Sequence, residues 1–148
     1  MSLPRRLPFA GVSLLWAGVV VGVAFAEAVK FQAPTLSRGV ALDVGRTVFH
    51  ASQWAQVGLL VLALGAALAG RVPRSAWACL LLVTAALVLQ MVWVFPELAA
   101  RAQAVLAGGM PPGPSRHTVY TLLEALKLLG LVAGAVVSAW PQTRIRSA

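Results

Sequence analysis

The sequence predicts an all-α fold: an integral membrane four-helix bundle with helical extensions on the non-cytoplasmic side. Hydrophobic residues make up 59% of the 148 residues and charged residues only 11%, whereas a soluble domain is nearer half apolar and about a quarter charged. Four apolar segments are each long enough to cross a hydrocarbon core of about 30 Å. Arginine pairs flank these segments in a pattern that sets one orientation. We therefore expect one membrane domain covering residues 1–148.

The four predicted spans cover residues 8–29, 48–69, 76–95 and 118–140. The first also fits a signal peptide, because Ala24-Phe25-Ala26 resembles a cleavage site after a basic start and an apolar run. The apolar character continues without a break to Lys30 and Phe31. We therefore expect an uncleaved anchor.

The charge pattern predicts the orientation of the spans. Arginines precede the first span, occupy the second connection and follow the last span, at Arg5, Arg6, Arg71, Arg74, Arg144 and Arg146. Short positive segments stay in the cytoplasm, so we expect a bacterial inner-membrane protein with both termini cytoplasmic. The net charge of +8 is thus explained by topology. The sequence has no basic stripe interleaved with aromatic residues, so its positive charge does not indicate nucleic-acid binding.

The connections on the other side are longer and predict the helical extensions. Thr35 can cap a helix that begins before the second span. After the third span the helical pattern continues from Pro96 towards Gly108. The stretch G-G-M-P-P-G-P-S, residues 108–115, is typical of a turn.

Polar residues collect in the outer halves of the spans. At about 100° per residue, His117, Tyr120, Glu124 and Lys127 share one face of the last helix. Lys127 lies roughly 15 Å along that helix at 1.5 Å per residue, and a charge at mid-bilayer costs about 2.5–3.5 kcal/mol. This stripe should therefore face the bundle interior or a wet cavity, with Glu124 as the nearest counter-ion of Lys127.

We therefore predict a polar pocket that opens to the non-cytoplasmic side and is closed by Leu, Val and Ala at the cytoplasmic half. Its predicted lining is Glu27, His50, Gln53, Gln90, Glu97, His117, Tyr120, Glu124 and Lys127. A structural alternative is that Glu124 and Lys127 form a buried pair that only fixes helix register. Trp16, Trp54 and Trp93 are expected near the pocket, or else in the aromatic belt or the core.

The predicted pocket suggests three functions. The first is binding, or helping to move, a small solute or metal ion, with His50 and His117 as candidate metal ligands. The second is a redox subunit in which these two histidines hold haem b. The third is a non-catalytic assembly or scaffold subunit that meets a second copy or other membrane subunits. Known catalytic motifs such as GxSxG, HExxH and the Walker loop are missing from the sequence, so nothing indicates an enzyme.

Short motifs give a family resemblance that covers most of the chain. They are V-A-F-A-E-A-V-K-F-Q-A-P-T-L-S-R, Phe49-His50-Ala51-Ser52 at the second span, Pro96 after the third, and Arg116-His117 before the last. With these the chain resembles the bacterial family called domain of unknown function 4149, which is similar to transmembrane protein 205, a eukaryotic protein associated with resistance to platinum drugs. The resemblance implies a four-helix membrane protein and singles out Phe49, His50, Ser52 and His117. The connection before the last span is shorter here than in longer relatives.

Overall fold

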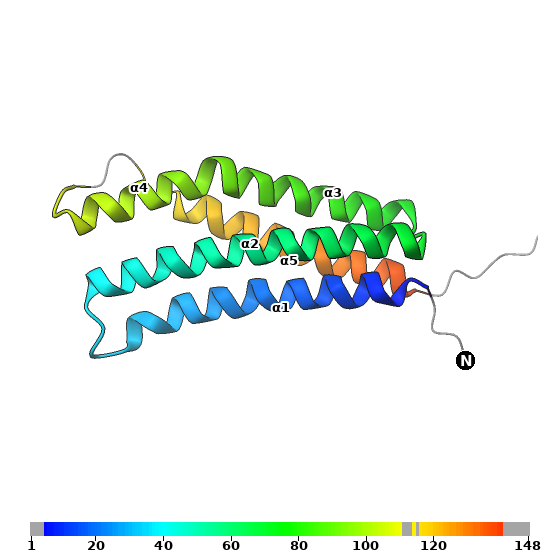
Figure 1. Ribbon diagram of the computed structural model, residues 1–148, viewed down its shortest axis with the longest axis horizontal. Helices are drawn as coiled ribbons and strands as arrows, with labels where there is room; N and C mark the ends of the chain where they lie inside the picture. The colour runs from blue at the N-terminus through cyan, green and yellow to red at the C-terminus, as the bar shows by residue number, and fades with distance from the viewer. Residues whose placement is uncertain (1–4, 111–113, 115, 141–148) are drawn as a thin grey trace, which may run out of the picture.

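The fold is all-α, and four long apolar helices pack side by side as a bundle (Figure 1). The computed structural model describes residues 5–110, 114 and 116–140. Its elements are α1 (Leu7–Val29), η1 (Lys30–Gln32), α2 (Arg38–Gly70), α3 (Arg74–Leu89), η2 (Gln90–Val94), α4 (Phe95–Leu106) and α5 (His117–Ala139). The prediction of an all-α four-helix bundle is confirmed.

Four helical stretches are long and apolar enough to cross a membrane: Leu7–Gln32, Gly39–Gly70, Arg74–Leu106 and His117–Ala139. The protein is therefore a multi-pass membrane protein. Its outward faces carry large apolar side chains such as Leu15, Leu62 and Leu129, as expected of a surface that contacts lipid.

The second and third helical stretches, Gly39–Gly70 and Arg74–Leu106, are longer than the spans predicted for them. α2 has 33 residues, about 50 Å at 1.5 Å per residue, which exceeds the bilayer core. The start of α2 and the end of α4 lie together beyond the start of α5, at the left in Figure 1. We call this the open end of the bundle, made of η1, the first turns of α2, α4 and the first turns of α5. The cap of α2 is Ser37 rather than Thr35, since the Ser37 hydroxyl accepts the Val40 N–H at 3.4 Å.

The third helical stretch, made of α3, η2 and α4, contains a π-helical turn. η2 is a π-helical turn in which the Phe95 N–H bonds the Gln90 carbonyl, and Pro96 follows it in α4. Proline has no N–H to donate to the preceding turn, and a π-turn is a common way to absorb such a defect. The extra residue in this turn rotates α4 by roughly 100° about the helix axis relative to α3. Gln90 and Glu97 therefore do not share one continuous face.

The opposite, closed end is tightly packed. Trp16, Ala63 and Leu80 belong to its buried apolar core, which α1, α2 and α3 share with α5. Glycine brings α5 close to α3, because a Cβ on Gly130 would lie 2.8 Å from Val83 Cγ2. By contrast, a Cβ on Gly18 would meet no atom within 4 Å. The Gly130/Gly134 pair is thus used within the chain.

Candidate functional site

Lys127 is the centre of a buried polar network. Its side chain is 0% exposed, and its Nζ donates to Gln56 Oε1 at 2.6 Å and to Glu124 Oε1 at 3.0 Å. A buried ammonium must be paired and hydrogen-bonded to be tolerated in a membrane interior. The two acceptors come from α2 and α5, so the ammonium joins helices that lie far apart in the sequence.

Gln56 is held in one amide orientation by its neighbours. Its Oε1 accepts from Lys127 and also from Trp16 Nε1 at 3.1 Å, while its Nε2 donates to Ser52 Oγ at 3.3 Å. The flipped amide would point N–H groups at two donors and is excluded. The network therefore extends from α1 through α2 to α5.

Glu124 uses only one of its two carboxylate oxygens in this network. Gln90 Nε2 donates to Glu124 Oε1 at 3.1 Å and to the Tyr120 carbonyl at 3.2 Å, and Lys127 is the second donor to Oε1. Two donors from different elements therefore fix the carboxylate plane. The other oxygen, Oε2, is buried and has no hydrogen-bond partner among the described residues.

Glu124 also lines two cavities that share part of their walls. The smaller, of about 20 Å³, is lined by Val20, Val23, Ala24, Phe49, Ser52, Tyr120 and Glu124. The larger, of about 340 Å³, is lined by Ala24, Glu27, Ala28, Phe31, Phe49, His117, Tyr120, Thr121 and Glu124. Phe49 and Tyr120, whose ring centroids lie 5.0 Å apart in an edge-on contact, belong to both linings. The network thus borders on a recess between α1, α2 and α5.

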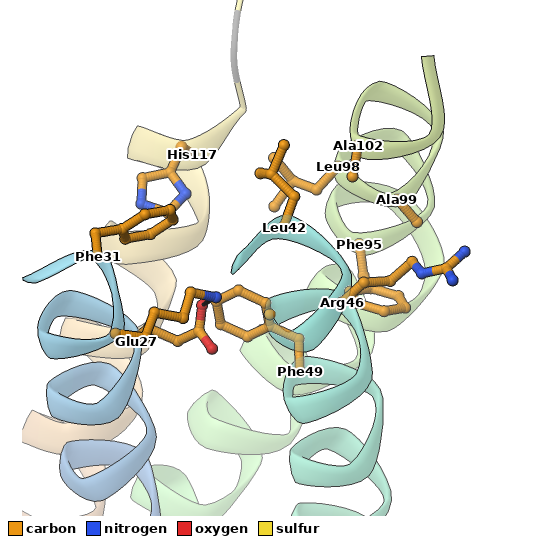
Figure 2. Close-up of a pocket in the computed structure, with 12 residues that line it drawn as sticks. Glu27, Phe31, Leu42, Arg46, Phe49, Phe95, Leu98, Ala99, Ala102 and His117 are labelled. Carbon is orange, nitrogen blue, oxygen red and sulfur yellow. Dashed lines mark hydrogen bonds and ion pairs between the residues drawn. The ribbon is translucent and has the colours of Figure 1, made fainter. Parts of the chain in front are cut away.

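A third cavity, of about 150 Å³, adjoins this recess at the open end and is shown in Figure 2. Phe31, Phe49 and Phe95 contribute aromatic rings to its wall, together with aliphatic side chains of α2 and α4. Glu27 and His117 line both this cavity and the larger one. His117, the first residue of α5, lies next to Phe31 of η1 (Figure 2).

The polar groups of this third cavity are already paired in part. Lys30 forms an ion pair with Glu27, and Arg46 forms one with Asp43 at 2.8 Å. Gly45 makes room for the first pair, because a Cβ at that position would collide with the Lys30 ammonium. The charges in this part of the wall therefore largely cancel.

His50 lies apart from the other predicted site residues. It is exposed, and its ring lies 6.3 Å from that of Phe95. It lines a different cavity, of about 350 Å³, with Arg46, Thr47, Phe95, Ala99 and Gln103. The reason is its position around the helix axis. Phe49, Ser52 and Gln56 share the inward face of α2, whereas His50 lies about 100–160° around the axis from them. The structure therefore does not bring His50 and His117 into one of these cavities.

Two further predicted residues also lie outside the recess. Glu97 accepts a hydrogen bond from Arg116 Nε at 2.6 Å in a partly exposed pair, and the Arg116 guanidinium lies 4.7 Å from the centroid of the Trp93 ring. Gln53 is buried, and its Nε2 has no partner among the described residues. Among residues 5–110, 114 and 116–140, no group of three His, Cys, Asp or Glu side chains is placed to hold a metal ion.

Sequence reasoning did not include Gln56, Ser52 and Trp16 in the predicted lining, although all three belong to the hydrogen-bonded network. A signal was present, because Ser52 and Gln56 are four residues apart on the face of α2 that carries Phe49. Trp16 was considered only as a neighbour. Its indole N–H needed a partner once buried, as is usual for tryptophan.

The geometry therefore identifies a candidate binding site at the open end, made of the recess at Glu124 and the adjoining aromatic cavity. The resemblance to the family of unknown function stays a prediction. Comparison of the chain with protein-family models, with curated proteins and with solved structures found no match.

Proposed function

We propose that this multi-pass membrane protein binds, or helps to move, a small solute in the recess between α1, α2 and α5. The observation that carries the proposal is the wall of the recess. Phe31, Phe49 and Tyr120 contribute aromatic rings to it, and Glu124, whose carboxylate is held by Gln90 and Lys127, also lines it. Small-molecule sites are commonly pre-formed, mostly apolar and equipped with a few placed polar groups.

The open end is also where a solute would enter. Ala28, His117 and Thr121 line the recess and are themselves exposed, so its rim is accessible from the open end and from the side between α1 and α5. The predicted orientation would place this rim on the non-cytoplasmic face. The closed end, packed by Ala63, Leu80 and their neighbours, supports binding from one side, and movement across the membrane would need a rearrangement.

Geometry favours a solute over a metal or haem. A metal site would need several ligands that converge, and the only two histidines, His50 and His117, line different cavities. Bis-histidine haem ligation would need the two rings to face one another across the macrocycle. The scaffold alternative finds support in one feature, the outward-facing glycines Gly18 and Gly22 of α1.

Binding can be tested with 4-fluorotoluene, followed by its fluorine NMR signal in nanodiscs, with protein-free nanodiscs correcting for partition into lipid. We expect saturable binding to the wild type and loss of at least about tenfold in affinity for Ala28→Trp, because the indole would fill the recess. Ala26→Trp is the matched control, since Ala26 is exposed on the same helix and does not line the recess.

A second pair of variants separates the two histidines. His117→Leu changes the wall of the recess and should alter the affinity, whereas His50→Leu should leave it unchanged. The proposal is wrong if the wild type shows no saturable binding above protein-free nanodiscs. It is equally wrong if Ala28→Trp and Ala26→Trp bind the probe as the wild type does.

A further inference from the structure

The cavity that contains His50 lies between α2 and α4, and we call it the lateral cavity. Its volume is about 350 Å³, and its lining consists of Arg46, Thr47, His50, Phe95, Ala99 and Gln103. We propose that it binds the phosphate group of a membrane phospholipid, with Arg46 as the main ligand and His50 and Gln103 as further donors. The lateral cavity shares no lining residue with the recess at Glu124, so this site is independent of the proposed function.

The lateral cavity lies at the depth of the lipid head groups. At 1.5 Å per residue, His50 lies about 30 Å before the end of α2 at Gly70, which is the thickness of a hydrocarbon core. The exposed Trp54 and Trp93 lie near the same level, where tryptophan is enriched at a membrane interface. Arg46 lies about one turn beyond His50, in the layer that contains the phosphates of a leaflet.

The polar side chains of the lateral cavity can donate hydrogen bonds to a ligand. Arg46 has five N–H groups, and its partner among the described residues is Asp43, at 2.8 Å from Nη2. The side chains of His50 and Gln103 have no hydrogen-bond partner in the described part of the chain. Thr47 differs, because its hydroxyl already donates to the Asp43 carbonyl at 3.1 Å. A guanidinium, an imidazole and an amide are therefore available to an acceptor.

These donors are accessible from the bilayer. In Figure 2 the side chain of Arg46 passes the ring of Phe95, and its guanidinium points away from Phe49. Arg46 and Phe95 line both the lateral cavity and the aromatic cavity, so they form part of the wall between the two. The Arg46 side chain is 37% exposed, and His50 and Gln103 are exposed as well. A ligand at the surface of the bundle can therefore reach all three.

The charges favour an anion over a cation. Among the described residues, no acidic side chain lines the lateral cavity. Asp43 pairs with Arg46 from outside this lining and is itself 57% exposed, and such exposed pairs contribute little to stability. A phosphate can therefore share the guanidinium with Asp43 or replace it. Guanidinium groups also match phosphate geometry, because two parallel N–H groups can donate to two phosphate oxygens.

The surroundings of the lateral cavity favour a lipid over a soluble phosphate ester. Trp54 lies one turn below His50, with the two ring centroids 6.5 Å apart, and is 59% exposed. Its ring is placed to contact the glycerol and the first acyl carbons of a lipid whose phosphate is at Arg46. The bilayer itself supplies that phosphate at the right depth, and basic pockets between membrane helices bind head groups in this way.

The test is a titration of the detergent-solubilised protein with dioleoyl phosphatidylglycerol, followed by native mass spectrometry. Arg46→Gln should weaken binding of the first lipid by about tenfold or more, because charge-assisted hydrogen bonds are lost. The matched control is Arg101→Gln, which makes the same change at a residue of α4 that does not line the lateral cavity. This control should leave the affinity nearly unchanged.

A second pair of variants distinguishes this site from the recess. His50→Leu should weaken phosphatidylglycerol binding and leave 4-fluorotoluene binding unchanged, whereas Ala28→Trp should have the opposite effects. The His50 side chain is exposed, so its replacement should not prevent folding. Loss of both ligands in either variant would contradict two separate sites.

Two further probes identify the part of the lipid that is recognised. Dioleoylglycerol has the same chains without the phosphate, and glycerol 3-phosphate has the phosphate without the chains, so both should bind more weakly than the phospholipid. Equal binding of phosphatidylglycerol to the wild type, Arg46→Gln and Arg101→Gln would overturn the proposal. Dioleoylglycerol binding as tightly would rule out phosphate recognition, and glycerol 3-phosphate binding as tightly would replace the lipid with a soluble ester.

Discussion

Removing the ammonium of Lys127 should destabilise the bundle strongly. Lys127→Met keeps a side chain of similar length but leaves the Glu124 carboxylate, 14% exposed, without its counter-ion, although Gln90 still donates to it. Breaking a buried ion pair by removing one partner costs about 3–5 kcal/mol, whereas an exposed pair contributes about 0–1 kcal/mol. Because the Lys127 side chain is 0% exposed, we expect a loss in the upper range.

The loss can be measured as the free energy of unfolding in mixed micelles, with increasing SDS and tryptophan fluorescence as the readout. The matched control is the double variant Glu124→Gln with Lys127→Met, in which no buried charge is stranded. We expect this double variant to unfold nearer the wild type than Lys127→Met alone, with a coupling of about 2–3 kcal/mol. A coupling free energy below about 1 kcal/mol, as expected of an exposed ion pair, would refute the buried pair.

Five further variants test the surroundings of the site by the same unfolding measurement. Gln56→Leu should cost about 1–3 kcal/mol because two buried donors lose their acceptor, whereas Gln53→Leu, which removes an amide nitrogen without a described partner, should be neutral or stabilising. Gly130→Ala should cost about 1–3 kcal/mol through overpacking, and its control Gly18→Ala should stay within about 0.5 kcal/mol. Glu97→Gln should cost less than about 1 kcal/mol, because this pair with Arg116 is 36% and 41% exposed. Equal losses for both members of either control pair would contradict the packing described.

Membrane helices can be recognised from sequence because bilayer thickness imposes a length and an apolar composition on each span. The confirmed bundle follows from that constraint, whereas the extension after the third span was indicated by the helical pattern between Pro96 and Gly108. The exact cap was missed, since Thr35 and Ser37 are both suitable residues and only backbone geometry separates them.

The candidate site was harder to predict because periodicity describes one helix at a time. It places Tyr120, Glu124 and Lys127 on one face of α5, and the structure shows Tyr120 and Lys127 buried there. It does not say how α2 is rotated against α5. His50 and Gln53 were therefore both placed in the pocket, although the packing buries Gln53 and leaves His50 exposed.

The π-turn at Gln90–Val94 was a second obstacle. The predicted lining included both Gln90 and Glu97, as a regular helix would allow, but the inserted residue separates them. Gln90 then reaches Glu124 on α5, while Glu97 pairs with Arg116 near the surface. Pro96 signals an irregularity in the sequence, yet proline alone does not distinguish a kink from a widened turn.

The most direct test of the account is a solid-state NMR distance in lipid bilayers between nitrogen-15 at lysine Nζ and carbon-13 at glutamine Cδ. The sequence has only two lysines, Lys30 and Lys127, and Lys127 Nζ lies 2.6 Å from Gln56 Oε1. We predict strong dipolar contact that persists in Lys30→Arg and disappears in Lys127→Met. If no lysine ammonium is in contact with a glutamine side chain, the buried network does not exist and the account is contradicted.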